Sequence, residues 1–170
     1  NNLKLAHIED NFQYFSDIDK PKTSSGIGKQ YIVRNDLDFL VSKKSSFNLI
    51  TEYQYNEAEG FGSGIQNPKR NAANFSLLYR NVNLEKFYWE LGAKQDFVEG
   101  YKSPFLFSAS AKYLVNNWYQ SSINISRNFK APTFNDLYWE PGGNRDLIPE
   151  TSYQAEMSHY FSYHNFKLGI

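Results

Sequence analysis

The stretch Phe105-Leu106-Phe107-Ser108-Ala109-Ser110-Ala111-Lys112-Tyr113 carries an apolar side chain at every odd-numbered position. Its even-numbered positions are mostly serine or lysine. Successive side chains of a β-strand point to opposite faces of the sheet, so this alternation predicts a strand with one apolar face and one polar face. The odd-numbered pattern recurs in the windows 31–41, 47–55, 73–79, 87–93, 119–125 and 153–161.

Two further strands are predicted at the ends of the chain. Residues 3–15 predict a strand whose alternation is irregular around His7 to Asn11, and residues 165–170 predict the start of a last strand. The composition agrees, because the 170 residues include 14 Phe and 13 Tyr but only 1 Met. No segment shows the apolar spacing of three and four residues that is typical of a helix.

Composition also excludes several classes of function. Lys and Arg number 18 and Asp and Glu also number 18, so the net charge gives no support to a nucleic-acid partner. The absence of cysteine excludes disulfides, a thiol nucleophile and thiolate metal ligands. The chain begins at Asn1 without a signal peptide and stops within an apolar alternation, so we expect it to be a section of a larger protein.

The connections between the predicted strands alternate in length. Connections at 16–28, 57–71, 98–104 and 129–151 are medium or long, whereas those at 43–46, 81–83, 116–117 and 163–165 are short. In an antiparallel meander, alternate connections lie at opposite ends of the sheet, and outer-membrane barrels combine short turns at one end with long loops at the other. Several windows also reach the roughly ten residues that a tilted strand needs to cross a bilayer.

These patterns predict an all-β fold, an antiparallel up-and-down meander of about eight strands plus the start of another, which forms part of a transmembrane β-barrel. Rings near the strand ends, such as Tyr53, Tyr55, Trp118 and Tyr163, would form its aromatic girdles. Two alternatives stay open at this point. One is a small closed outer-membrane barrel that acts in binding or adhesion, and the other is a soluble β-sheet binding module that buries Trp89, Phe107 and Ile123 between two sheets.

One segment, Ser126 to Glu156, resembles the late-barrel signature of TonB-dependent outer-membrane receptors, and within that family it is most similar to the cobalamin-receptor branch. Arg145 departs from the family pattern, which usually has proline there. The motif residues that carry the resemblance are Ala131, Pro132, Phe134, Asn135, Asp136, Leu137, Tyr138, Gly143, Asn144, Leu147, Pro149, Glu150, Ser152 and Glu156.

The resemblance implies a receptor in the outer membrane of a Gram-negative bacterium that imports a bulky nutrient, such as cobalamin, an iron chelate or a glycan. Such receptors have a barrel of 22 strands around an N-terminal plug, and the TonB complex supplies energy through a segment ahead of the plug. Residues 1–170 would then be a section of the barrel without the plug. The implied partners are outer-membrane lipid, the TonB complex through the missing N-terminal part, and an extracellular small molecule or glycan.

No enzyme is expected, because no spaced set of His, Ser and acidic residues forms a catalytic constellation. No cofactor is expected either. The acidic residues Asp136, Glu140, Asp146 and Glu150 make a hard cation in the 136–150 loop conceivable, although their spacing matches no calcium loop. Ligand contacts are expected from the long-loop end, where the candidates are Phe61, Asn67, Arg70, Tyr101, Tyr138, Trp139, Asn144 and Arg145.

Overall fold

The computed structural model describes residues 1–140 and 142–170, apart from the side chains of Asn83 and Leu84. It consists of one antiparallel sheet in which nine strands follow one another in chain order. One short helix, α1, lies between the seventh and eighth strands. The elements are β1 (Asn2–Tyr14), β2 (Ser24–Ser42), β3 (Ser45–Phe61), β4 (Lys69–Leu84), β5 (Phe87–Val98), β6 (Leu106–Asn116), β7 (Tyr119–Lys130), α1 (Phe134–Tyr138), β8 (Glu150–Tyr163) and β9 (Phe166–Gly169).

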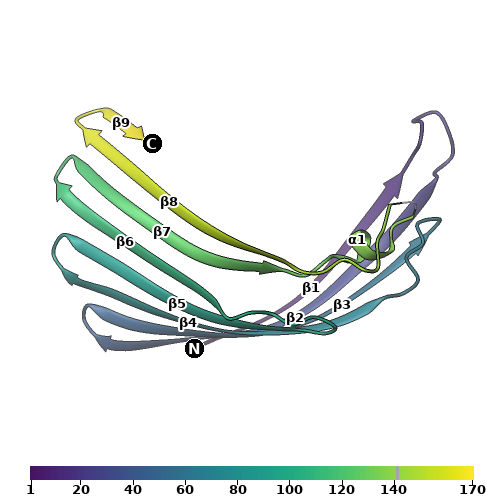
Figure 1. Cartoon of the computed structure of the whole chain (residues 1–170), viewed down its shortest axis with the longest axis horizontal. Coiled ribbons are helices and arrows are strands. Elements are labelled where there is room, and N and C mark those ends of the chain that lie inside the picture. The colour runs from purple at the N-terminus through teal and green to yellow at the C-terminus, as the bar shows by residue number, and fades with distance from the viewer. Residues whose placement is uncertain (141) are drawn as a thin grey trace.

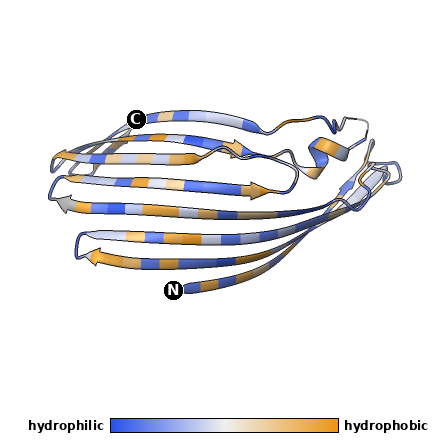
Figure 2. Cartoon of the chain, turned by 60° about the horizontal axis from the view of Figure 1, so that its bottom comes forward, coloured by the Kyte–Doolittle hydropathy of each residue, from blue (hydrophilic) through white to orange (hydrophobic). Residues whose placement is uncertain are grey.

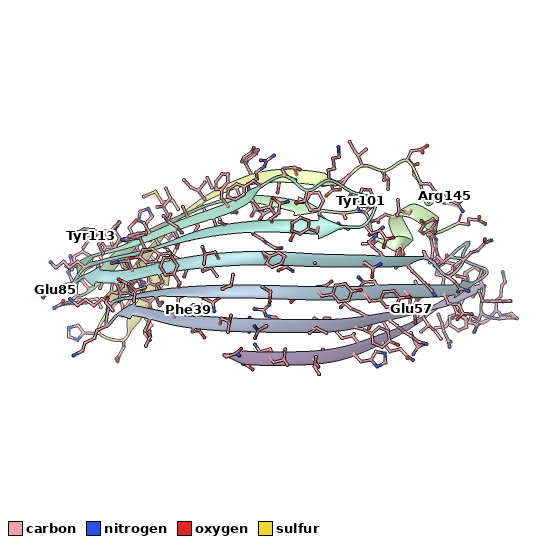
Figure 3. The ribbon with its side chains drawn as sticks, turned by 90° about the horizontal axis from the view of Figure 1, so that it is seen from below. Phe39, Glu57, Glu85, Tyr101, Tyr113 and Arg145 are labelled. Atoms are coloured by element: carbon pink, nitrogen blue, oxygen red, sulfur yellow. The ribbon has the colours of Figure 1, made fainter. Side chains whose placement is uncertain are left out.

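The sheet curves into a trough, with the tight turns at one end and the long connections at the other (Figure 1). Residues Glu85, Tyr113 and Phe39 mark the tight-turn end in Figure 3, and Tyr101 and Arg145 mark the long-loop end. The predicted meander of eight strands and the start of another is therefore confirmed. The sheet is open, because β1 pairs only with β2 and β9 only with β8, so the small closed barrel finds no support.

The described residues form almost no hydrophobic core. Ile65, Leu106 and Leu137 are the apolar residues buried among them. The accessible surface is 12015 Å², whereas a compact protein of 19.8 kDa would expose about 8,600 Å². Phe107 and Ile123 are 37% and 45% exposed, and the described strands belong to one sheet, so the predicted burial between two sheets is wrong.

The two faces of the sheet differ in polarity, as the alternating colours along the strands show (Figure 2). Odd-numbered side chains of the central strand segments lie on the convex face and are mostly apolar. One cross-strand row on this face consists of Phe39, Phe47, Tyr79, Leu91, Ala109, Ile125 and Ala155. On β2 this apolar band runs from Tyr31 to Val41, which is about 34 Å along the strand. A strand tilt of about 40° gives this length a height of roughly 25 Å, which is the height of the apolar band of a membrane barrel.

Even-numbered side chains on the concave face carry charges that are paired. Lys4 Nζ donates to Asp36 Oδ2 at 2.9 Å, and Arg34 Nε donates to Asp36 Oδ1 at 2.8 Å. Arg34 also contacts Glu52 at 3.5 Å, and Gln54 donates to the other oxygen of Glu52 at 2.6 Å. Because these charges are paired within and between neighbouring strands, this part of the concave face is a polar wall that suits a hydrated interior.

Several strand ends lie beyond the predicted boundaries. The connections predicted at 16–28 and 57–71 are too long, because β2 already begins at Ser24 and β3 continues to Phe61. The extra residues pair in register, for example Lys29 with Glu57 and Gly26 with Gly60. They lie beyond the apolar band, so both faces are polar and the apolar alternation no longer marks the strand.

Two tight turns are also displaced from their predicted places. Asn81 lies within β4, whose register shift near Asn81 moves the turn to Glu85 and Lys86. The turn predicted at 116–117 lies at Asn117 and Trp118, where Asn116 Oδ1 accepts from the backbone N–H groups of Trp118 and Tyr119 at 3.0 and 2.9 Å. No helix of the described residues is long and apolar enough to cross a membrane.

Candidate functional site

Helix α1 is the one helix among the described residues, and the sequence analysis did not predict it. Its start is fixed by a capping box: Thr133 Oγ1 accepts from the N–H of Asp136 at 3.2 Å, and Asp136 Oδ2 accepts from the N–H of Thr133 at 2.8 Å. These hydrogen bonds hold the pKa of the Asp136 carboxyl below its usual range. Five residues are too few to show an apolar period, so local capping is the signal that predicts this helix.

The connection from β7 to β8 folds back over the long-loop end of β1 to β4, where α1 lies inside the trough (Figure 1). The backbone N–H of Glu140 donates to the carbonyl of Ser63 at 2.9 Å. Ser63 is fully buried, and Ile65 and Leu137 are 2% and 4% exposed. The connection is therefore anchored to the β3–β4 loop by a hydrogen bond, and both segments contribute buried apolar side chains.

Arg70 joins three separate parts of the chain. Its Nη1 donates to the carbonyl oxygen of Pro132 at 2.6 Å. Its guanidinium carbon lies 4.9 Å from the ring centre of Phe134 and 5.2 Å from that of Tyr101. A planar guanidinium stacks on rings and donates at its edge at the same time, so one side chain ties the start of β4, the β5–β6 loop and α1 together.

A second aromatic cluster lies where Trp139 meets β1. The Trp139 ring is 5.5 Å from the ring of Phe12 and 6.4 Å from that of Tyr14, the latter edge-on. Gly26 lies opposite Phe12 in the register, and a Cβ at Gly26 would collide with the Phe12 ring. Glycine at this position therefore leaves room for the Phe12 ring beside the β2 backbone.

Between α1 and the concave ends of β1 to β3 lies a cavity of about 310 Å³. Both apolar and polar residues line it, which suits a ligand with rings and hydrogen-bonding substituents. Residues that line it include Ile8, Asp10, Phe12, Gln30, Asn56, Ile65, Thr133, Phe134 and Asn135.

The second half of the connection is a compact turn. The N–H of Gly143 donates to the carbonyl of Trp139, and the N–H of Asn144 donates to the carbonyl of Asp136 at 2.8 Å. A Cβ at Gly143 would lie within 3.0 Å of backbone atoms of Tyr138 and Trp139, so this position requires glycine. Beyond the turn, the Arg145 guanidinium lies 5.3 Å from the ring centre of Tyr138.

The structure brings together most of the predicted ligand residues. Arg70 and Tyr101 share one cluster with Phe134, and Tyr138 stacks with Arg145. Asn144 supports the turn through its Oδ1, which accepts from the N–H of Asp146 at 2.9 Å. Phe61 and Asn67 lie apart from this group: Phe61 is 74% exposed at the end of β3, and Asn67 lines a separate depression with Glu57 and Glu59.

The sequence analysis missed Phe12, Tyr14 and Ile65. Phe12 and Tyr14 occupy even-numbered positions, where apolar side chains would face the interior of a barrel. The irregular alternation of 3–15 is the signal that could have found them, because a ring on the polar face indicates a partner there. The conceivable cation site is not assembled, since no three His, Asp or Glu side chains gather to hold a metal ion in the described ranges.

A profile of the family described as TonB dependent receptor-like, beta-barrel, matches residues 4–169. The chain belongs to this family. This match confirms the resemblance to TonB-dependent receptors that the motif at 126–156 indicated. β-Barrels of this family reside in the outer membrane of Gram-negative bacteria, and the family consists of receptors and transporters.

Two curated relatives are vitamin B12 transporters named BtuB. The chain is 27% identical over 130 residues to the one from Photobacterium profundum, which covers 69% of this chain and 22% of that protein. It is 66% identical over 29 residues to the one from Vibrio vulnificus, which covers 17% of this chain and 5% of that protein. The chain thus spans less than a quarter of the length of these relatives.

Among solved structures, the siderophore receptor PirA from Pseudomonas aeruginosa superimposes with a TM-score of 0.69. The match covers 86% of this chain and 30% of the receptor, at 16% sequence identity. At this identity the match supports the barrel fold and leaves the solute open.

Proposed function

We propose that this chain is a section of an outer-membrane receptor that captures a bulky nutrient of the cobalamin type for energised uptake. The observation that carries the proposal is the site inside the trough, where residues 133–135 of the β7–β8 connection and the ends of β1 to β3 line a cavity that contains the rings of Phe12 and Phe134. The names of the two curated relatives favour vitamin B12 among the possible solutes.

In this proposal the residues of the chain bind and orient the solute and do not transform it. The rings of Phe12 and Phe134 offer apolar faces to a large planar solute, and Gln30, Asn56 and Asn135 offer hydrogen bonds beside them. Trp139 packs against the Phe12 ring and holds it in place. The polar concave face, with its pairs around Asp36, forms the wall of the path. The plug and the contact with the TonB complex belong to parts of the receptor outside this segment.

The test is solute binding to the full-length receptor that contains this segment, reconstituted in lipid nanodiscs. Vitamin B12, a ferric siderophore and an oligosaccharide are titrated separately by calorimetry. We expect vitamin B12 to bind, and we expect Trp139→Ala to weaken its affinity by about tenfold, because the Phe12 ring in the cavity loses the ring that packs against it. Trp118→Ala, at the opposite end of the barrel, is the matched control and keeps wild-type affinity.

Binding of the siderophore or the oligosaccharide in place of vitamin B12 would replace the cobalamin assignment with that solute. Equal affinities of wild type and Trp139→Ala for every solute that binds would contradict the position of the site. Uptake by cells that lack TonB would contradict energised transport.

A further inference from the structure

One amide interrupts the apolar band on the convex face of β2. Asn35 occupies an odd-numbered position between Val33 and Leu37, so it shares the face of these apolar side chains. The register places Leu3 of β1 on one side of it and Thr51 of β3 on the other. Asn35 and Thr51 therefore form a polar spot of two neighbouring side chains on a surface that is apolar around them.

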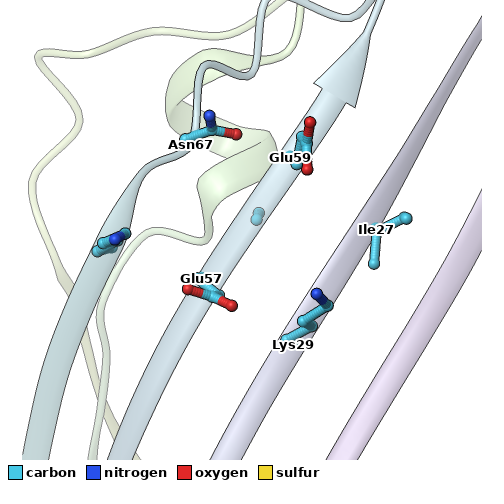
Figure 4. Close-up of a pocket in the computed structure, with 7 residues that line it drawn as sticks. Ile27, Lys29, Glu57, Glu59 and Asn67 are labelled. Atoms are coloured by element: carbon cyan, nitrogen blue, oxygen red, sulfur yellow. The ribbon is translucent and has the colours of Figure 1, made fainter.

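The polar spot lies deep in the apolar band, away from both of its borders. Toward the long-loop end the surface becomes charged beyond Tyr31, where Lys29 and Glu57 line a depression of about 220 Å³ (Figure 4). Asn35 lies about 14 Å along the strand from Tyr31 and about 20 Å from Val41. A strand tilt of about 40° turns these lengths into heights of about 10 and 16 Å, so the amide faces the hydrocarbon when the barrel spans a membrane.

Neither polar side chain has a partner within the barrel wall. Among the described residues, the structure gives no hydrogen bond to the side-chain amide of Asn35 or to the hydroxyl of Thr51, and both side chains are half-buried. By contrast, Gln95 lies in the same cross-strand row and donates to the backbone carbonyl of Ser103 at 3.2 Å. An amide without a hydrogen-bond partner is strongly unfavourable in hydrocarbon, so Asn35 requires a partner from outside the wall.

We propose that this face binds a second copy of the receptor within the membrane, with the amide of Asn35 bonded to Asn35 of the second copy. A carboxamide carries both N–H donors and a carbonyl acceptor, so two carboxamides related by a two-fold axis exchange two hydrogen bonds. A two-fold interface brings the same patch of both copies together, which is the arrangement that a self-complementary group needs. Thr51, beside Asn35, offers an acceptor to the remaining N–H of the amide.

Lipid does not replace the second copy at this depth. Acyl chains carry no hydrogen-bonding group, and the headgroups lie beyond Tyr31, about 10 Å of height from the amide. The neighbouring side chains Leu5, Val33 and Tyr53 are exposed, so they pack against the second copy around the amide pair and exclude lipid from it. The inference goes beyond the proposed function and depends on the membrane placement of the barrel, not on the solute.

The experiment uses the full-length receptor that contains this segment, labelled with donor or acceptor dyes and mixed in lipid vesicles. Energy transfer between copies, measured as the protein-to-lipid ratio falls, gives the dissociation constant of the dimer. We expect the wild type to dimerise, and we expect Asn35→Leu to weaken dimerisation by about tenfold because the amide pair is lost. Ser121→Leu, which removes a polar side chain from the same face on β7, is the matched control and keeps the wild-type constant.

A wild type that stays monomeric at every ratio would overturn the inference, and so would equal dimerisation of the wild type and Asn35→Leu. The free energy of unfolding in dilute vesicles, where the receptor is monomeric, is a second test. Asn35→Leu should stabilise the monomer there, since an apolar side chain replaces an amide in hydrocarbon, and a loss of stability would show that Asn35 has a partner in its own barrel. A receptor that dimerises but binds no vitamin B12 would contradict the proposed function alone.

Discussion

At the residue scale, Gly26 determines where the ring of Phe12 can lie. A methyl group at Gly26 would meet this ring and lie 3.0 Å from the carbonyl oxygen of Glu59. We expect Gly26→Ala to displace Phe12 from Trp139 and to weaken solute binding several-fold, since the Phe12 ring lines the site. Calorimetric titration of the full-length receptor with vitamin B12 measures the effect.

Gly169→Ala is the matched control for this substitution. Gly169 lies at the end of β9, away from the site, and a Cβ there would meet the Tyr160 ring at 3.9 Å, an ordinary contact distance. The control should therefore bind like the wild type. If both variants bind equally, or if both lose binding, the Phe12 ring does not act as proposed.

Arg70 is the second residue on which the site depends. Arg70→Lys keeps the positive charge but loses the planar group that contacts Tyr101, Phe134 and the Pro132 carbonyl. We expect faster hydrogen exchange in residues 99–105 and 131–140 of this variant, by about fivefold, because cation–π contacts contribute about 0.5–1 kcal/mol each. Arg80→Lys, which changes an arginine near the tight-turn end, should leave exchange in these loops unchanged.

At the element scale, α1 depends on its capping box. Asp136 accepts from the Thr133 N–H as a carboxylate, and this holds the pKa of Asp136 below its usual range. Because the pKa of Asp136 is lowered in the folded state, its carboxylate stabilises the helix fully at pH values above the usual carboxyl pKa range. This stabilisation is lost as the pH falls through the lowered pKa. We therefore expect exchange protection of the Leu137 and Trp139 amides to be constant at neutral pH and to fall in acid.

Asp136→Asn provides the control for this pH dependence, because it keeps an acceptor of similar shape but does not titrate. The acid-induced loss of protection should be absent from this variant, and protection at neutral pH should be lower than in the wild type. The same acid dependence in the wild type and in Asp136→Asn would assign the titration to another group.

At the scale of the whole molecule, the described part of the sheet has almost no hydrophobic core of its own, and its stability depends on what covers the convex face. Leu77 lies on this face in the middle of β4, and Ser76 lies beside it on the concave face. We expect Leu77→Arg to lower the free energy of unfolding of the receptor in lipid vesicles by about 2–4 kcal/mol, since the charge would face hydrocarbon. Ser76→Arg should cost far less, and a larger cost for Ser76→Arg would reverse the assignment of the two faces.

How accurately the sequence predicted each strand segment depended on whether the two faces of that segment have different surroundings. Between Tyr31 and Val41 the alternation identified both the strand and its apolar face, because apolar and polar surroundings lie on opposite faces there. From Ser24 to Gln30 the same strand has polar surroundings on both faces, and only its pairing with β3 shows that it continues. The turn between β4 and β5 was predicted too early for a similar reason. The strand continues past a register shift near Asn81, and such a bulge leaves no periodic signal in the sequence.

The sequence by itself determined the all-β meander, the apolar face of each crossing segment, the end that carries the long loops and the family motif at 126–156. These features repeat every two residues or lie in one short segment, so local physical chemistry suffices to identify them. The tertiary structure alone decided that the β7–β8 connection folds onto β1 to β4. Arg70 and Pro132 lie 62 residues apart, and Phe12 and Trp139 lie still further apart in the chain. Their contacts follow from the curvature of the whole sheet, which no local pattern encodes.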